Sequence, residues 1–331
     1  MTHFAEDVLD ASLPIVDPHH HFYNNATPPY LLGDLLADIT SGHNVQKTVY
    51  VECESMYTTD GSPEMRPVGE TAFVNETAAR TASGRLGNVR APAAIVGYAD
   101  LMLGEAVHPV LEAHIRAGGG RFRGIRNPTL WDIDERPARS IGVRNDRGLL
   151  LDPRFRAGFS LLAGYGLSFD ALVLFHQLKD VTDLARRFPQ TTLILDHCGF
   201  PIATAPYAGL SKEVVAVWKP LLRELACEPN VVVKLGGLGM PLFGFGFDAK
   251  VPPADSQVLA SAWRPYIETC IELFGTDRCM FESNFPEDRP TCTYRVLWNA
   301  FKRITAGYSS SEKSALFNLT ASRVYRIEPA H

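Results

Sequence analysis

The sequence predicts an α/β fold of the (β/α)8 barrel class, and three observations lead to this prediction. Short apolar segments alternate with longer amphipathic segments along the chain, as in repeated βα units. Eight such units can be counted, and their apolar segments are rich in Val, Ile, Leu and Phe without strict alternation, as in parallel strands covered by helices. The 331 residues accommodate the roughly 250 residues of such a barrel. We therefore expect a single TIM-barrel domain over residues 1–331, with a core of about 13–327.

The eight expected strands are short apolar runs that end in polar residues. They span residues 15–21, 47–56, 91–101, 121–127, 167–175, 191–197, 230–238 and 279–285. Active sites of this fold class lie at the carboxyl ends of the strands. The polar residues at these ends are therefore the first candidates for a functional site.

The segments between the strands have the apolar periodicity of helices. They include residues 104–117, 153–164, 179–188, 210–227, 256–274 and 293–305, and a C-terminal helix is expected from Ser310 to near Arg323. Asp152 followed by Pro153 is a typical helix start. Two long segments, 127–150 and 236–255, are expected to be extended βα loops over the C-terminal face of the barrel.

Composition and charge disfavour several classes of partner. The chain has 32 Lys and Arg against 37 Asp and Glu, and no basic stripe that would bind nucleic acid. No apolar run approaches the ~20 residues of a membrane span, and the first residues lack a signal-peptide pattern, so we expect no membrane association and a cytoplasmic location. The six cysteines are dispersed, as expected for reduced thiols. A homo-oligomer is compatible with these features.

The strongest functional signal is the Asp-Pro-His-His-His segment at 17–21, at the end of the first expected strand. His19 and His21 are two residues apart, so on a strand they project to the same side and can bind one ion. His176 and His197 end the fifth and sixth expected strands, which would bring four imidazoles to the barrel mouth. Imidazole suits zinc, manganese and iron. A histidine-rich loop start without a metal is the alternative.

A resemblance to a known family rests on five segments: IVDPHHHFY, GGGRFRGIRN, FPQTTLILDHCGFP, NVVVKLGGLGMP and FGTDRCMFESNFPED. With these segments, in this order over residues 13–327, the chain resembles the amidohydrolase superfamily, in the amidohydrolase-related branch that includes 2-pyrone-4,6-dicarboxylate lactonases and sugar lactonases. The resemblance implies a hydrolase with a divalent metal ion, zinc or manganese, bound by His19, His21 and His176. It also implies His197 as a catalytic histidine. A site without a metal is the alternative that the lactonase branch leaves open.

One position departs from the pattern of the family. Asn284 stands where many relatives carry an aspartate, and a neutral amide cannot accept the proton of an attacking water. Glu282 lies two residues earlier, on the same face of the expected strand. We hypothesise that Glu282 supplies the missing carboxylate, as base or ligand, with His197 as the other candidate base. A purely structural pairing of Glu282 with an arginine is the alternative.

Candidate substrate-binding residues lie at strand ends and in the long loops. Arg126 is expected to bind a substrate carboxylate, a role that the resemblance also favours. Arg123 is a second candidate that could instead pair with an internal acid such as Glu52. Lys234 fits a buried ion pair and a substrate contact equally well. The remaining candidates are Glu54, Trp131 and Phe243.

These observations predict a hydrolase that opens a lactone or related ester of a small carboxylated, and hence anionic, molecule. Two alternatives stay open. One is a non-oxidative decarboxylase of an aromatic or unsaturated carboxylic acid, which Asn284 disfavours because such relatives also rely on the aspartate. The other is a catalytically silent small-molecule binding protein that has kept the pocket.

Overall fold

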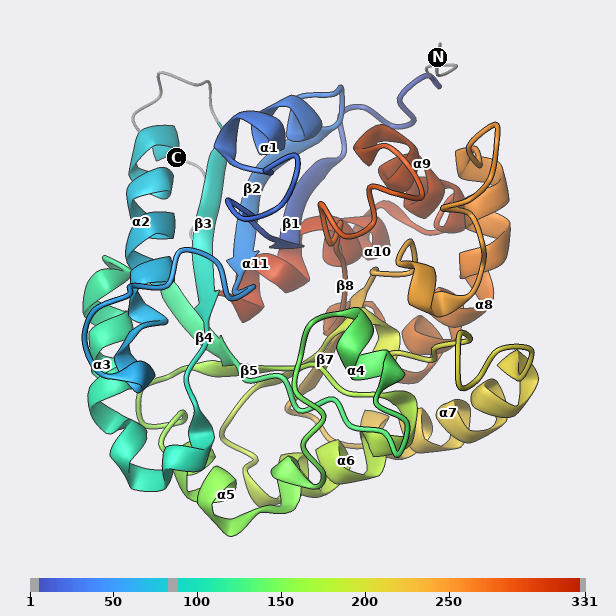
Figure 1. Cartoon of the computed structure of the whole chain (residues 1–331). Coiled ribbons are helices and arrows are strands. Elements are labelled where there is room, and N and C mark those ends of the chain that lie inside the picture. The colour runs from blue at the N-terminus through green and yellow to red at the C-terminus, as the bar shows by residue number, and fades with distance from the viewer. Residues whose placement is uncertain (1–5, 83–88, 328–331) are drawn as a thin grey trace.

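The structure is a nearly closed barrel of parallel strands surrounded by helices (Figure 1). It is a computed structural model that describes residues 6–82 and 89–327. The eight strands pair in sequence order, and β1 meets β8 through hydrogen bonds from His21 N to Phe285 O and from Asn284 N to His19 O, both 2.9 Å long. The predicted TIM barrel is therefore confirmed.

All eight strands lie within or close to the predicted segments, and each ends earlier than predicted. They are β1 (Pro14–His20), β2 (Asn44–Val51), β3 (Arg90–Gly97), β4 (Phe122–Arg126), β5 (Ser168–Ala171), β6 (Leu193–Leu195), β7 (Val231–Leu235) and β8 (Cys279–Phe281). The chain turns out of the sheet at the carboxyl ends, where His197 and Asn284 have positive φ angles of 51° and 55°. A residue in this conformation cannot continue a strand, so the candidate site residues lie on the turns just beyond the sheet.

The helices cover the outside of the barrel. They are α1 (Leu32–Ile39), α2 (Val68–Ala82), α3 (His108–Ala117), α4 (Arg136–Ser140), α5 (Pro153–Ser160), α6 (Leu178–Arg187), α7 (Ser211–Ala226), α8 (Ser256–Phe274), α9 (Tyr294–Ile304), α10 (Ser310–Ser314) and α11 (Thr320–Val324). Asp152 caps α5 as predicted, by accepting a hydrogen bond from Arg154 N. The expected C-terminal helix is α10 and α11 joined by a π-helical segment, Ala315–Leu319. Within residues 6–82 and 89–327, no helix is long and apolar enough to cross a membrane.

The inside of the barrel has an apolar layer and, above it, a polar layer. Val232 and Met280 belong to an apolar cluster that includes residues of β1, β2, β3 and β6 and of the C-terminal segment. Lys234 and Glu282 follow Val232 and Met280 by two residues each and are fully buried. Because side chains two apart on a strand share a face, the polar layer lies directly over the apolar one, toward the carboxyl ends of the strands.

An extra residue in β1 determines which of the three histidines face the barrel interior. Asp17 pairs with Thr48 and His20 pairs with Tyr50, so three steps on β1 oppose two on β2, as in a β-bulge. Val16 faces the barrel interior, and strict alternation would turn His20 inward. After the bulge, His20 instead contacts Thr48 through a 2.8 Å hydrogen bond. His19 and His21 consequently face the inside of the barrel.

Candidate active site

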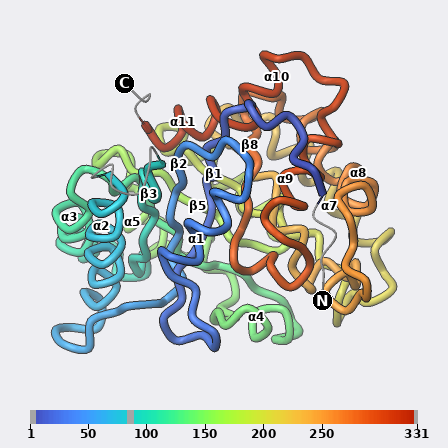
Figure 2. Tube along the Cα trace, turned by 90° about the horizontal axis from the view of Figure 1, so that it is seen from above, coloured from blue at the N-terminus to red at the C-terminus, as the bar shows by residue number. Residues whose placement is uncertain are grey.

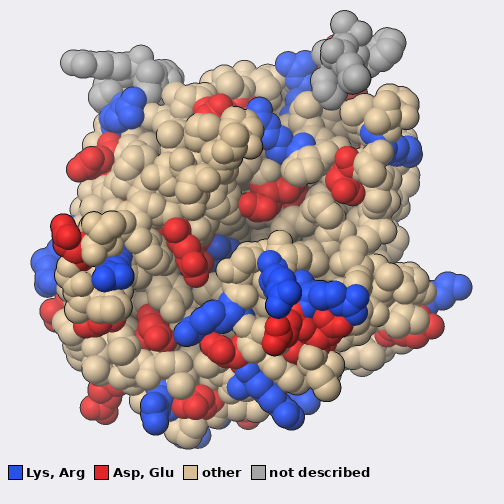
Figure 3. All heavy atoms as spheres, in the orientation of Figure 1, with Lys and Arg blue, Asp and Glu red and all other residues tan. Residues whose placement is uncertain are grey.

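A cavity of about 280 Å³ lies at the carboxyl ends of the strands. Figure 3 shows the molecule hollowed beside the loop that carries α4, with acidic side chains near the edge of the hollow. The cavity is lined by His21, Tyr23, Asn25, Glu52, Cys53, Glu54, Arg126, Pro128, Ile141, Gly142, Val143, Leu172, His197, Phe200, Met240, Asn284 and Glu287. Both long loops that were expected to cover the mouth contribute to this wall.

His19 and His21 present ring nitrogens to each other. Their Nε2 atoms are 3.1 Å apart, and Nδ1 of His21 donates a 2.8 Å hydrogen bond to the carbonyl oxygen of Val51. Burial is the main cause that holds the pKa of each imidazole well below its ordinary value. Both rings are therefore neutral, and His21 carries its lone pair on the Nε2 that faces His19.

Glu282 lies between two histidines. Its Oε1 accepts a 2.7 Å hydrogen bond from Nδ1 of His197, and its Oε2 lies 2.8 Å from Nδ1 of His19. Burial would lower the pKa of His197, but the charge and hydrogen bond of Glu282 outweigh burial and raise it. The bond to Nδ1 leaves Nε2 of His197 as the nitrogen that can accept a proton, on a side chain that lines the cavity.

Two glycines make room for this pair. Gly236 and Gly237 follow β7, and a Cβ at Gly237 would lie 2.4 Å from Nδ1 of His197. A Cβ at Gly236 would lie 2.3 Å from Cγ of Glu282. Gly237 also has a φ of 69°, which a residue with a side chain rarely adopts. The two glycines are therefore required for the close approach of β7 to the His197–Glu282 pair.

The polar layer beneath the histidines is an ion-pair network around Lys234. Its Nζ lies 2.6 Å from Oδ2 of Asp170, 3.1 Å from Oδ1 of Asp196 and 3.0 Å from Nδ1 of His19. Burial opposes the charge on Lys234, but the two carboxylates outweigh it and raise its pKa. Lys234 is fully buried and does not line the cavity, so the structure places it in buried pairing.

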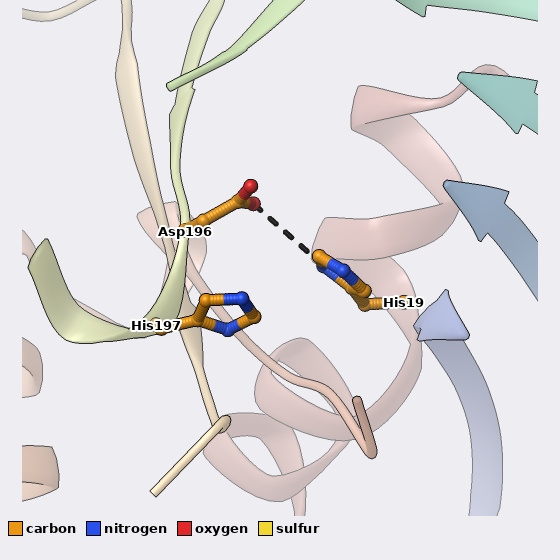
Figure 4. A group of neighbouring side chains, drawn as sticks. All are labelled: His19, Asp196 and His197. Atoms are coloured by element: carbon orange, nitrogen blue, oxygen red, sulfur yellow. Dashed lines mark ion pairs between the residues drawn. The ribbon is translucent and has the colours of Figure 1, made fainter. Parts of the chain in front are cut away.

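The residues at this point fit a divalent cation. Nitrogen atoms 3.1 Å apart can both lie at the 2.0–2.1 Å of a Zn–N bond from one ion. His19, Asp196 and His197 also offer ligand atoms within 4.8 Å of one another (Figure 4). The buried Asp196 carboxylate takes part in two ion pairs, with Oδ1 3.1 Å from Nζ of Lys234 and Oδ2 3.9 Å from Nη1 of Arg126. Asp196 is thus already paired with two cationic side chains, and the fit to a metal ion rests on the two histidine nitrogens.

Arg126, Asn284 and Glu54 line the cavity, as the sequence suggested, but Arg126 is already paired. Its Nε lies 2.6 Å from Oε1 of Glu52, and its terminal nitrogen also contacts the carbonyl oxygen of Glu52. Asn284 donates a 2.8 Å hydrogen bond from Nδ2 to Asp288. Glu54 is exposed at the mouth.

Two further candidates, His176 and Trp131, lie in the loops beside the cavity and do not line it. Nε2 of His176 is 2.9 Å from Oδ2 of Asp132, which also accepts a 2.5 Å hydrogen bond from Tyr207. The ring of Trp131 packs edge to face against His176. Because β5 ends at Ala171, His176 lies on the following 3₁₀ turn, away from the His19–His21 pair.

Arg123 and Phe243 also lie away from the cavity. Nε of Arg123 donates a 2.9 Å hydrogen bond to the carbonyl oxygen of Tyr325 in the C-terminal segment. Phe243 is buried behind the cavity wall and packs against Phe200, which does line it. These contacts support the structure around the site and leave neither side chain available at the cavity surface.

Sequence reasoning missed several residues of the cavity wall. Tyr23 had a usable signal, because it follows His21 by two residues. Phe200 and Met240 lie within the segments that carry the family resemblance, but nothing in their type marks them as cavity residues. Glu287 follows the last strand by six residues and reaches the mouth only through the turn after Phe285.

Comparison with known proteins places the chain in a family. The model of the family named Amidohydrolase matches residues 16–327. The L-fucono-1,5-lactonase of Burkholderia multivorans is 31% identical over 268 residues, which cover 79% of this chain and 78% of that protein. The uncharacterized protein y4mH of Sinorhizobium fredii is 31% identical over 340 residues, which cover 96% of this chain and all of that protein.

Solved structures share the same barrel. An amidohydrolase from Burkholderia multivorans, determined with bound zinc, superposes with a TM-score of 0.70 at 24% identity over 95% of this chain and 99% of that chain. The 5-carboxyvanillate decarboxylase of Sphingomonas paucimobilis superposes with a TM-score of 0.56 at 13% identity over 96% of this chain and all of that chain. From the match over residues 16–327 and the shared barrel, we conclude that this chain belongs to the amidohydrolase family.

Proposed function

We propose that this protein is a lactonase that hydrolyses a small polyhydroxylated lactone, with zinc or manganese bound through His19 and His21. The site supports this proposal through one observation above all. The buried Glu282 carboxylate orients His197, and His197 faces the cavity beside the histidine pair. A base, a cation site and a cavity of substrate size are thus adjacent. Two relatives named L-fucono-1,5-lactonase and one named L-rhamnono-gamma-lactonase support the lactone as the substrate class.

His197 acts as the general base in this proposal. Its Nε2 takes a proton from a water molecule, whose oxygen attacks the lactone carbonyl carbon. The ring C–O bond then breaks, and the leaving oxygen receives the proton from His197, which yields a hydroxy acid. When bound, the metal ion would polarise the carbonyl group and lower the pKa of a bound water. Glu282 stabilises the imidazolium that forms and fixes the tautomer of His197.

In this proposal, Asn284 has a different role from the aspartate that many relatives carry at its position. Its Nδ2 donates to Asp288, so its Oδ1 is the atom left to face the cavity as an acceptor. An amide oxygen accepts a hydrogen bond from a water or a substrate hydroxyl but does not take up the proton. The orientation of Asn284 therefore suits a binding role, while proton transfer falls to His197.

The charge of the cavity favours a neutral substrate over the anionic one expected from the sequence. The wall carries the carboxyl groups of Glu52, Glu54 and Glu287 against the guanidinium of Arg126. Glu52 already pairs with Arg126, so the unbalanced charges at the mouth are negative. Carboxylates accept hydrogen bonds from hydroxyl groups and repel other carboxylates. A polyhydroxylated lactone therefore fits this wall better than a carboxylated one.

Product analysis tests this function. The purified protein, supplied with zinc or manganese, is incubated with L-fucono-1,5-lactone, with 2-pyrone-4,6-dicarboxylate and with 5-carboxyvanillate. We expect release of one proton per sugar lactone opened, above the spontaneous rate, and the loss of this activity in His197→Gln. Release of carbon dioxide would instead show a decarboxylase, and saturable binding without turnover of any compound would show a binding protein.

A further inference from the structure

The C-terminal segment closes the barrel at the end opposite the cavity. Figure 2 shows α11 at one end of the barrel and α4 at the other. Val324, Tyr325 and Ile327 pack into the apolar cluster inside the barrel, against residues of the strands. Arg123 holds this segment in place through its hydrogen bond to the carbonyl oxygen of Tyr325. The last described residues are therefore part of the barrel interior.

Tyr325 extends from this segment into the polar layer. Its hydroxyl donates a 2.9 Å hydrogen bond to Oδ2 of Asp170, and the Nζ of Lys234 lies 5.7 Å from the centre of its ring. Both the tyrosine and Asp170 are fully buried. The other carboxylate oxygen of Asp170 has no hydrogen-bond partner among the described residues. Among the described residues, Tyr325 and Lys234 are thus the hydrogen-bond and ion-pair partners that hold the Asp170 carboxylate.

Lys234 connects this arrangement to the histidine pair. The Oδ2 atom that accepts from Tyr325 is the one that lies 2.6 Å from Nζ of Lys234. The same Nζ lies 3.0 Å from Nδ1 of His19, for which Oε2 of Glu282 competes at 2.8 Å. Of these two contacts, only that of Lys234 is a hydrogen bond, because Oε2 of Glu282 has no hydrogen-bond partner among the described residues. The position of Lys234 therefore fixes the hydrogen bond that Nδ1 of His19 makes.

We propose that Tyr325 is a positioning residue for the active site, acting through Asp170 and Lys234 on the ring of His19. The hydroxyl holds Asp170, the carboxylate holds the ammonium group, and the ammonium group holds the ring of His19 through its contact with Nδ1. The placement of this ring sets the position of its Nε2, which faces Nε2 of His21 at 3.1 Å. This inference concerns the protein itself and holds for any reaction that uses the histidine pair.

Nitrogen NMR of histidine side chains tests this inference directly. The protein is labelled with ¹⁵N-histidine, and the two ring nitrogens of His19 are assigned by comparison with His19→Gln. Their chemical shifts depend on the hydrogen bond that each nitrogen makes, and they are recorded on metal-free protein. We expect Tyr325→Phe, which keeps the ring and removes only the hydroxyl, to shift both nitrogen resonances of His19 and to lower kcat about tenfold with little change in KM.

Tyr30→Phe is the matched control. Tyr30 is also buried and donates a 2.9 Å hydrogen bond to a carboxylate, that of Asp38, in the segment around α1. It should lose similar stability and leave the His19 resonances in place. Adding Tyr325→Phe to Asp170→Asn should give no further shift, because the hydroxyl acts through Asp170. Unchanged His19 resonances in folded Tyr325→Phe would overturn the inference, and so would equal shifts in Tyr30→Phe.

Discussion

Glu282 accepts a 2.7 Å hydrogen bond from Nδ1 of His197, and both side chains are buried. Replacing the carboxylate by an amide in Glu282→Gln removes the charge that stabilises a protonated His197. General bases contribute roughly 10²- to 10⁴-fold to rate, and we expect kcat to fall within this range with a much smaller change in KM. Initial rates over a series of lactone concentrations measure both constants.

The same variant makes a pH prediction. The charge of Glu282 raises the pKa of His197, and a general base works only when it is unprotonated. Removing the charge should therefore lower this pKa and move the acidic limb of the kcat profile to lower pH. A limb that stays in place while kcat falls would show that His197 is not the base.

Metal content separates the predicted histidine ligands. His19 and His21 face each other inside the barrel, whereas His176 is hydrogen-bonded to Asp132 in the loops. We expect about one equivalent of metal in the parent protein, its loss in the His19→Ala/His21→Ala double variant and its retention in His176→Ala. Plasma mass spectrometry on protein purified without chelator gives these ratios. A parent that stays free of metal after supplementation would refute the metal assignment.

Glu54 should weaken binding of the anionic product. Opening a neutral lactone creates a carboxylate next to an exposed carboxylate at the mouth. Exposed charge pairs are worth about 0.2–1 kcal/mol, so in Glu54→Gln the inhibition constant of the hydroxy acid should fall roughly 1.4- to 5-fold. Glu76→Gln, which removes an exposed acid on α2, should leave it unchanged. The difference should vanish in about 1 M salt, where the Debye length is about 3 Å; a difference that persists in such salt would point to a cause other than charge.

Arg126 and Glu52 form a buried ion pair whose members stabilise each other. Arg126→Leu leaves an unpaired buried carboxylate, and we expect the free energy of unfolding to fall by about 3–5 kcal/mol. The double variant Arg126→Leu/Glu52→Leu removes both charges and should recover most of that loss. Urea denaturation of the three proteins measures the effect. A double variant less stable than Arg126→Leu would contradict this account.

His114, which lies away from the cavity, makes the stability of the fold depend on pH. It is fully buried between Thr71 and the carbonyl oxygen of Tyr98, and burial lowers its pKa from 6.5 to about 4. The unfolded chain therefore binds a proton at higher pH than the native protein does. Its contribution to stability is complete above pH 6.5 and is lost as the pH falls toward 4, by up to about 3 kcal/mol. His114→Gln should flatten this part of the stability curve, measured by urea denaturation at several pH values.

The barrel and the centre of the candidate site could be predicted because both follow from local pattern. Parallel strands bring their carboxyl ends together, so His19, His197 and Glu282 were expected near one another although they lie far apart in sequence. The structure places them in contact through one carboxylate. The period of two also placed Glu282 and Asn284 at the same end, although the strand itself stops at Phe281.

The remaining features depend on where the chain leaves the sheet. His176 was expected to join the histidines, but β5 ends four residues before Phe175, and the turn carries the ring into the loops. The contact of Tyr325 with Asp170 joins residues 155 apart in sequence, and nothing in the C-terminal sequence marks Tyr325 as a residue of the barrel interior. This contact forms because the C-terminal segment packs inside the barrel, and no periodicity of the sequence predicts that packing.

The bulge in β1 determines which histidines face the site. Residues 19–21 are three histidines in a row, so an imidazole would face the interior in either register. If the same residues formed a regular strand without the bulge, however, only His20 would point inward, and one imidazole instead of two would face the interior. Deleting Pro18 should therefore keep His19 and His21 inward, because the shortened segment would reach the same register with Tyr50 by regular alternation.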